Sequence, residues 1–183
     1  VIGEPLAANR GGEGHVYKRD GNYWTLYDTL VPANVSWMQR SGEYVSITHD
    51  GEFAAVAGIN HWTGAGYTPV LSIFKRNDNN NNYDLNKTIL YGDYATEKYT
   101  HVQIRKSNNG NILLFHLERS SGKVYCIKST DNGVNWSASS SNGTDTNAVA
   151  ATQTGTITSQ GYWWGKILQV DSRATRLITA DEA

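Results

Sequence analysis

The chain has 183 residues, of which 39% are hydrophobic and 18% are charged, and its formal net charge is -1 at pH 7. This length suits one sizeable hydrophobic core in a single domain. The near-neutral charge gives no electrostatic reason to expect a nucleic acid as partner. No run of residues approaches the ~20 apolar positions that a membrane-spanning helix needs, so we also expect no membrane insertion.

Short alternating runs dominate the sequence and predict six β-hairpins. The predicted hairpins span residues 15–30, 44–58, 70–90, 101–117, 123–139 and 166–180. Three of the turns contain Asp20-Gly21, Asp50-Gly51 and Asn109-Gly110, which are among the strongest short-range hairpin signals. The others run through the polyasparagine tract, through "STDNGVNWS" and near Arg173-Ala174.

Two hairpin types alternate along the chain, and equivalent points recur roughly every 55 residues, a period that indicates repeats of about four strands. We therefore expect a single all-β repeat domain over residues 1–183. Its predicted units are 166–183 plus 15–30, 44–90 and 101–139. The first of these would join the two ends of the chain, as ring-closing propellers do.

The single cysteine, Cys126, leaves no internal disulfide and lies in the alternating run "KVYCIKS". This pattern favours a buried structural thiol over a nucleophile. We predict no cofactor.

The stretch "STDNGVNWS" predicts a tight turn at residues 129–137. A carboxylate two residues after a serine accepts hydrogen bonds from backbone N–H groups of a turn, and a following glycine supplies a positive φ. A tryptophan three positions later packs beneath such a turn. The structural residues are Ser129, Asp131, Gly133 and Trp136.

The segment "GNILLFHLERSSGKVYCIKSTDNGVNWS" resembles a repeat of the Asp-box (BNR) β-propellers, the superfamily that contains the sialidases. The matching pattern is Ser-x-Asp-x-Gly-x-x-Trp, and "KRDGNYWT" is similar to a shortened copy that keeps Asp20, Gly21 and Trp24. The resemblance implies propeller-like four-stranded antiparallel units, with the motif on an outer turn away from the ligand face.

Three units do not close a propeller, which needs about four to eight blades. A homo-oligomer or a larger assembly would complete the ring. A β-trefoil, with three four-stranded repeats, is the alternative fold.

Long connections between hairpins predict the binding surface, because loops richer in aromatic residues than their strands are a functional hint. These loops span 32–42, 58–69, 91–101, 116–122 and 158–165. Flat aromatic rings beside polar groups suit sugars, so we predict an extracellular or virion-surface module for lectin-like adhesion. Its candidate ligand-binding residues are His61, Trp62, Tyr99, His116, Glu118, Arg119, Trp163 and Trp164.

Two other functions compete with a non-catalytic binding module. A sialidase-like hydrolase would use an arginine cluster, for which Arg40, Arg105 and Arg119 are the candidates. It would also need a carboxylate pair, such as Glu118 with Asp93. A structural coat, fibre or filament subunit would bury the aromatic loops against neighbouring chains. We predict no catalytic residue.

Metal-ligand spacing gives no site in the sequence. The tract "NDNNNNYD" at 77–84 lacks the glycine and the bidentate glutamate of a calcium loop. His61, His101 and His116 lack HxH or HExxH spacing. We therefore predict no metal centre.

Overall fold

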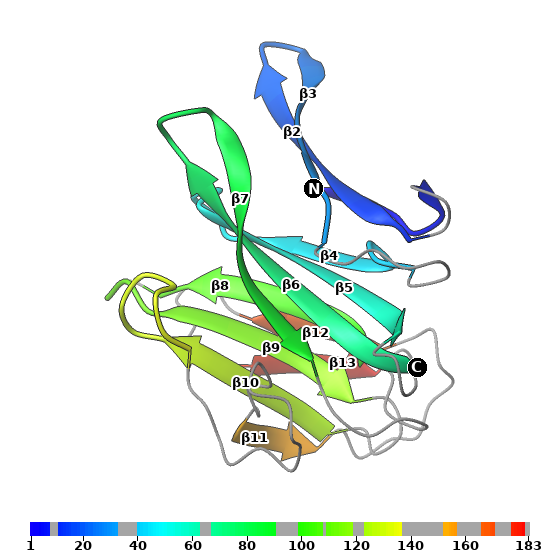
Figure 1. Cartoon of the computed structure of the whole chain (residues 1–183). Helices are drawn as coiled ribbons and strands as arrows, with labels where there is room; N and C mark the ends of the chain where they lie inside the picture. The colour runs from blue at the N-terminus through cyan, green and yellow to red at the C-terminus, as the bar shows by residue number, and fades with distance from the viewer. Residues whose placement is uncertain are drawn as a thin grey trace.

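The computed structural model describes residues 1–7, 11–32, 40–62, 67–90, 99–107, 109–118, 123–136, 152–156, 166–170 and 177–181. Within these ranges the chain forms thirteen strands, β1 to β13 (Figure 1). The protein is all-β, as the sequence predicts.

The strands form four antiparallel sheets. The first contains β1 (Ile2–Glu4), β2 (Glu13–Asp20) and β3 (Tyr23–Leu30), in that order. The second contains β4 (Tyr44–Ile47), β5 (Phe53–Trp62), β6 (Tyr67–Asn77) and β7 (Asn82–Leu90). The third contains β8 (Tyr99–Lys106), β9 (Ile112–Glu118), β10 (Lys123–Ser129) and β11 (Thr152–Thr156). The fourth contains β12 (Lys166–Val170) and β13 (Leu177–Asp181).

The β4–β7 sheet lies between the β1–β3 sheet and the β8–β11 sheet (Figure 1). Each four-stranded sheet pairs strands that follow one another in the chain, so both are simple meanders. Strand β3 lies beside β7, and β4 lies beside β8. Consecutive sheets therefore stack as layers.

Strand β5 explains this layering, because its first five residues are buried on both faces. Phe53, Ala55 and Ala57 belong to a core shared with β8 and β9, whereas Ala54 and Val56 belong to a second core shared with β2 and β3. A strand that is buried on both sides reads as a continuous apolar run with little alternation. The small alanine side chains let the neighbouring sheets approach closely.

The hairpins 15–30, 44–58, 70–90 and 101–117 are present as β2–β3, β4–β5, β6–β7 and β8–β9. The hairpin predicted at 123–139 differs, because residues 134–136 do not form a strand. The partner of β10 is β11, later in the chain, with Cys126 opposite Thr152 and Lys123 opposite Thr156.

The C-terminal hairpin 166–180 is present as β12–β13, and β12 lies beside β8. Among the described strands, β12 and β13 pair only with each other. The pairing of the two chain ends therefore stays a prediction.

Candidate functional site

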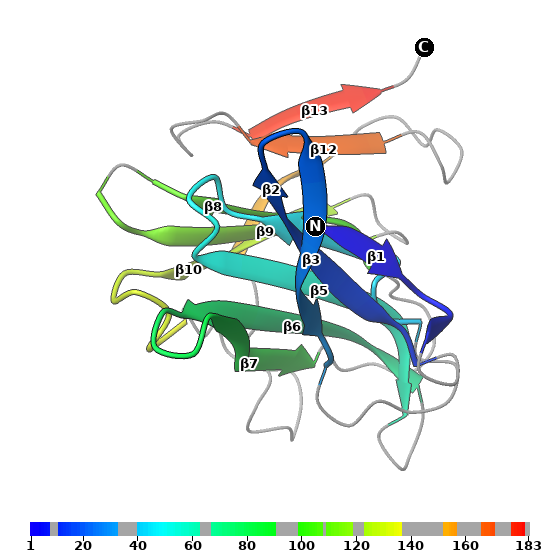
Figure 2. The same ribbon diagram turned by 90° about the horizontal axis from the view of Figure 1, so that it is seen from above.

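The hairpin turns of the two four-stranded sheets gather at one end of the molecule, here named the turn end (Figures 1 and 2). Lys106, at the end of β8, forms ion pairs with Asp50 at 3.0 Å and with Glu52, both on the β4–β5 turn. Lys75, near the end of β6, donates to the carbonyl oxygen of Asn132 at 3.1 Å. These contacts fix both sheets in the same orientation.

The opposite end, here named the loop end, is where strands β5, β7 and β9 end. Its edge is defined by cross-strand pairs: Trp62 lies opposite Tyr67, and Tyr99 lies opposite Glu118. Lys123 lies opposite Thr156 at the same edge. Because antiparallel strands alternate in direction, the chain leaves β5, β7 and β9 at this end.

The predicted ligand-binding residues that the structure describes all lie toward the loop end, but on strands. His61 and Trp62 form the last residues of β5, where they pair with Thr68 and Tyr67, so the predicted loop 58–69 is largely strand. Tyr99 begins β8, and His116 and Glu118 lie near the end of β9. Arg119, Trp163 and Trp164 lie outside the described residues. Asp93 does too.

The turn at 129–136 is held by a dense set of hydrogen bonds. The Ser129 hydroxyl donates to Asp131 Oδ1 at 2.8 Å and accepts from the Gly133 N–H at 2.8 Å. Asp131 also accepts from the backbone and side chain of Asn135, and these bonds lower the pKa of its carboxyl. Trp136 is 8% exposed and donates from Nε1 to Asn86 Oδ1. The hydrogen bonds that the Asp131 carboxylate accepts therefore hold the turn together.

Trp24 does not repeat the role of Trp136. It is 65% exposed on the β2–β3 hairpin, next to Tyr23 at 78% and near Leu26 at 55%. Trp24 lies opposite Arg19, and Leu26 lies opposite Tyr17. Trp24 and Leu26 therefore place exposed apolar side chains on one face of this hairpin. Sequence reasoning did not identify it, because Trp24 was considered only as part of the shortened motif.

Asp50, on the β4–β5 turn, is held in the ionised form. Partial burial opposes the charge of Asp50, but hydrogen bonds from the Thr48 hydroxyl, the Glu52 N–H and Lys106 lower its pKa to about 2. The Glu52 and Asp50 carboxylates in turn raise the pKa of Lys106. A general acid needs a pKa near the working pH. Asp50 is therefore a structural anion.

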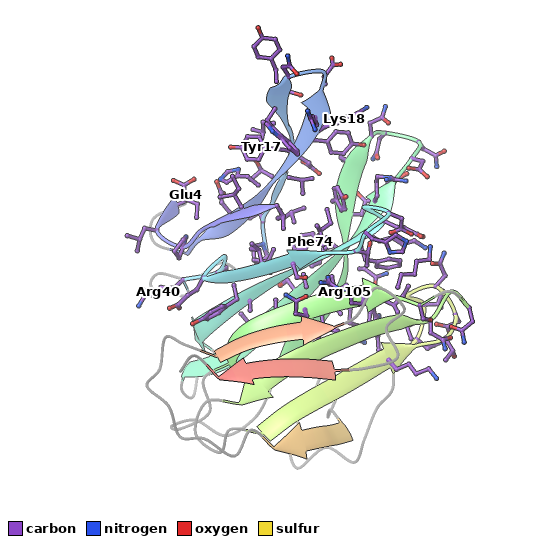
Figure 3. The ribbon with its side chains drawn as sticks, turned by 180° about the vertical axis from the view of Figure 1, so that it is seen from behind. Glu4, Tyr17, Lys18, Arg40, Phe74 and Arg105 are labelled. Atoms are coloured by element: carbon purple, nitrogen blue, oxygen red, sulfur yellow. The ribbon has the colours of Figure 1, made fainter. Side chains whose placement is uncertain are left out.

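Of the arginines considered for a sialidase-like site, Arg40 and Arg105 lie apart, and Arg119 lies outside the described residues. Arg40 forms an ion pair with Glu43 at 3.7 Å. Arg105, on β8, donates to the carbonyl oxygen of Ile104, and burial lowers its pKa. Figure 3 shows Arg40 and Arg105 well separated, so these two do not converge on one anion.

A group of potential metal ligands lies elsewhere, on the β1–β3 sheet. It consists of Glu4, Glu13 and His15, whose ligand atoms all lie within 4.8 Å of one another. The available sequence signal was the spacing of Glu13 and His15, but the predicted hairpin began at residue 15 and did not include Glu13. The third member of the group comes from a different strand, so spacing alone did not reveal it.

The sequence was compared with protein-family models and with curated proteins. No family model matches the chain, and no curated protein matches it either. Among the described residues, no helix has the length and apolar character that crossing a membrane requires.

Proposed function

We propose that the protein is a non-catalytic extracellular or virion-surface module that binds a glycan or a protein partner through its aromatic-rich loop end. The proposal rests on one observation: the two ends of the molecule differ in the contacts that they make. Ion pairs and hydrogen-bonded turns occupy the turn end, which leaves the loop end as the face that a ligand can use. Binding residues concentrate on loops that a scaffold positions in this way.

The composition at the loop end supports a glycan or protein ligand. Trp62, Tyr67 and Tyr99 lie at strand ends that flank the connections. Tryptophan and tyrosine supply large flat surfaces with a polar group, and they are enriched at binding interfaces. A sugar ring would stack its C–H face on such a surface.

A propeller-like architecture is part of the same proposal. Two four-stranded meanders stacked face to face, with the Ser129–Trp136 turn at the end away from the loops, support it. In this arrangement each sheet is one blade, and the loop end is the ligand face. The β-trefoil is the alternative architecture, and closure of the ring by two copies makes the protein a homo-oligomer.

A glycan array tests the proposed binding face. Labelled protein would be applied as the native chain, as Trp62→Ala and as Trp24→Ala, whose exposed indole lies on the β2–β3 hairpin. We expect the native chain to bind a defined subset of glycans and Trp62→Ala to lose about tenfold in affinity or more, as removal of an aromatic anchor does. Trp24→Ala should bind as the native chain does.

Two outcomes would contradict the proposal for glycans. Equal losses in both variants would show that the loop end is not the binding face. Absence of binding to any glycan would leave a protein partner as the ligand.

A second candidate function, a structural subunit, is favoured by one observation. Trp24 and Leu26 are exposed on a projecting hairpin, where the half-buried Tyr17 lies opposite Leu26 (Figure 3). Apolar side chains in such a position suit burial against another chain. In that function, Trp24→Ala would change the assembly state, whereas Trp62→Ala would not.

A further inference from the structure

Three side chains from two neighbouring strands converge on the outer face of the β1–β3 sheet. Glu4 on β1 lies directly opposite Glu13 on β2, and His15 follows two positions later on β2. Alternate residues of a strand share a face, and directly opposed residues of paired strands share it too. The His15 Nε2 atom lies 2.9 Å from Glu4 Oε2 and 3.3 Å from Glu13 Oε1.

The other face of the same strands is committed to the core. Val16 is 6% exposed and belongs to the core beneath β5, and Gly14 approaches Val56 closely. This packing forces Glu13 and His15 outward. Their side chains are 18% and 15% exposed, whereas Glu4 is 60% exposed. Figure 3 shows Glu4 on the side of the sheet away from the four-stranded layers. The group is therefore half-enclosed and opens to solvent beside Glu4.

The remaining nitrogen of His15 is also engaged. Its Nδ1 lies 3.3 Å from the hydroxyl oxygen of Thr29, which is the cross-strand neighbour of His15 on β3. Without a cation, Nε2–H donates to Glu4; when a cation replaces that proton, a hydrogen bond donated from Nδ1–H to the Thr29 oxygen would keep Nε2 directed toward the carboxylates. Metal-binding histidines are oriented in this way by a second partner.

We propose that Glu4, Glu13 and His15 bind a divalent transition-metal cation, for which zinc is the best fit. Imidazole nitrogen and carboxylate oxygen are both zinc ligands, and zinc sites with an open position use three protein ligands. Two donors at zinc bond lengths and the tetrahedral angle lie about 3.3 Å apart. The distances from Nε2 to the two carboxylates, 2.9 and 3.3 Å, are close to that value.

Charge and topology both favour a bound cation. Glu4 and Glu13 are like charges directly opposite each other in an antiparallel pair, an arrangement that destabilises strand pairing unless a cation compensates it. Strand β1 has three residues. A cation shared between the strands would hold β1 against β2, and the fourth position would face solvent and accept water.

Zinc titration of the full chain, purified without a polyhistidine tag, tests the site by isothermal calorimetry. We expect saturable binding of one zinc ion, with a rise in the thermal unfolding midpoint because zinc binds the folded state. Glu13→Gln and His15→Ala should each reduce affinity tenfold or more. His49→Ala, at an exposed histidine on the β4–β5 turn, should bind zinc as the native chain does.

A second pair of variants tests the orientation of the ring. Thr29→Val keeps the shape of the side chain but removes the hydroxyl, and it should weaken zinc binding by about 10–100-fold. Thr25→Val, on the same strand, should leave zinc binding unchanged.

The proposal is wrong if no saturable binding occurs up to millimolar zinc, since the contacts would then be a simple histidine–carboxylate ion pair. It is equally wrong if His15→Ala and Glu13→Gln bind zinc as tightly as the native chain. If His15→Ala fails to fold, Glu13→Gln and Thr29→Val decide the question.

Discussion

Gly133 lies at a position of the 129–136 turn where any side chain would be strained. Its φ is 83°, and a Cβ added there would lie 2.7 Å from Cε1 of Phe53, a fully buried ring. Any other residue meets both an unfavourable backbone conformation and a steric clash. We expect Gly133→Ala to lower the free energy of unfolding by about 1–3 kcal/mol. Urea denaturation measures this difference.

Gly21 provides the matched control. It also has a positive φ, 57°, but a Cβ there would meet nothing within 4 Å. Gly21→Ala therefore carries the backbone cost without the clash. Equal losses in the two variants would show that the contact with Phe53 contributes nothing.

Ser46 carries a hydrogen bond between two sheets. Its hydroxyl oxygen accepts from the backbone N–H of Ile104 at 3.1 Å, and both residues are buried. Ser46→Ala would leave that amide without this acceptor, at a cost of about 1–3 kcal/mol. Thermal and urea denaturation of the variant measure the loss.

Ser72 is a suitable comparison for Ser46. It is fully buried, and its hydroxyl makes no hydrogen bond with any residue that the structure describes. Ser72→Ala removes a polar group without breaking such a bond, so stability should be unchanged or higher. A loss as large as that of Ser46→Ala would contradict this assignment.

At the scale of elements, three turns at the turn end contain the same side-chain hydrogen bond. In each, a hydroxyl donates to the side-chain oxygen two residues later. The pairs are Thr48 with Asp50, Ser107 with Asn109, and Ser129 with Asp131. The side-chain bond holds the polar residue where it accepts a backbone N–H, and this stabilises the turn.

The Asp50 turn predicts a dependence of stability on pH. Its folded pKa, about 2, lies below the ordinary value of 3.8. The unfolded state therefore binds the proton more readily, and the stabilisation is complete above about pH 4 and lost as the pH falls to about 2. Urea denaturation at several pH values should show this loss.

Asp50→Asn should flatten that dependence. The variant lacks the titrating carboxyl and the charge that faces Lys106, so it should be less stable at neutral pH and change less on acidification. Asp20→Asn, on the exposed β2–β3 turn, controls for the loss of one surface charge. An acid profile of Asp50→Asn identical to that of the native chain would contradict the assignment.

At the scale of the whole molecule, local turn chemistry made most of the fold predictable. Asp50-Gly51 and Asn109-Gly110 fixed two hairpins, and alternation placed the strands around them. The partner of β10 was not predictable, because it begins at Thr152, well beyond the turn at 129–136. Pairing across a long connection leaves no signal in local sequence.

The candidate site was less predictable than the fold. The sequence predicted that the candidate ligand-binding residues lie at one end of the molecule. His61 and Trp62, however, are paired strand residues and not loop residues, because β5 extends four residues past Gly58. The Glu4–Glu13–His15 group depends on the register between β1 and β2, which turn chemistry does not determine. Such a group can be identified only once the register between the two strands is known.

The assembly state follows from the proposed ring. We expect light scattering after size-exclusion chromatography to give a mass of about twice the 20.2 kDa of one chain. A monomer would favour the trefoil, and a polymer would favour the structural subunit. Trp24→Ala should leave a ring dimer intact but should dissolve a polymer that uses the β2–β3 hairpin.

The ion pairs of Lys106 with Asp50 and Glu52 have a further consequence for how this chain can change. These ion pairs join the β4–β7 and β8–β11 sheets at the turn end, whereas the proposed ligand contacts lie at the loop end. Substitutions at the loop end should therefore leave these ion pairs unchanged. If the proposed binding function holds, ligand preference could change at the loop end while the turn end keeps the layers joined.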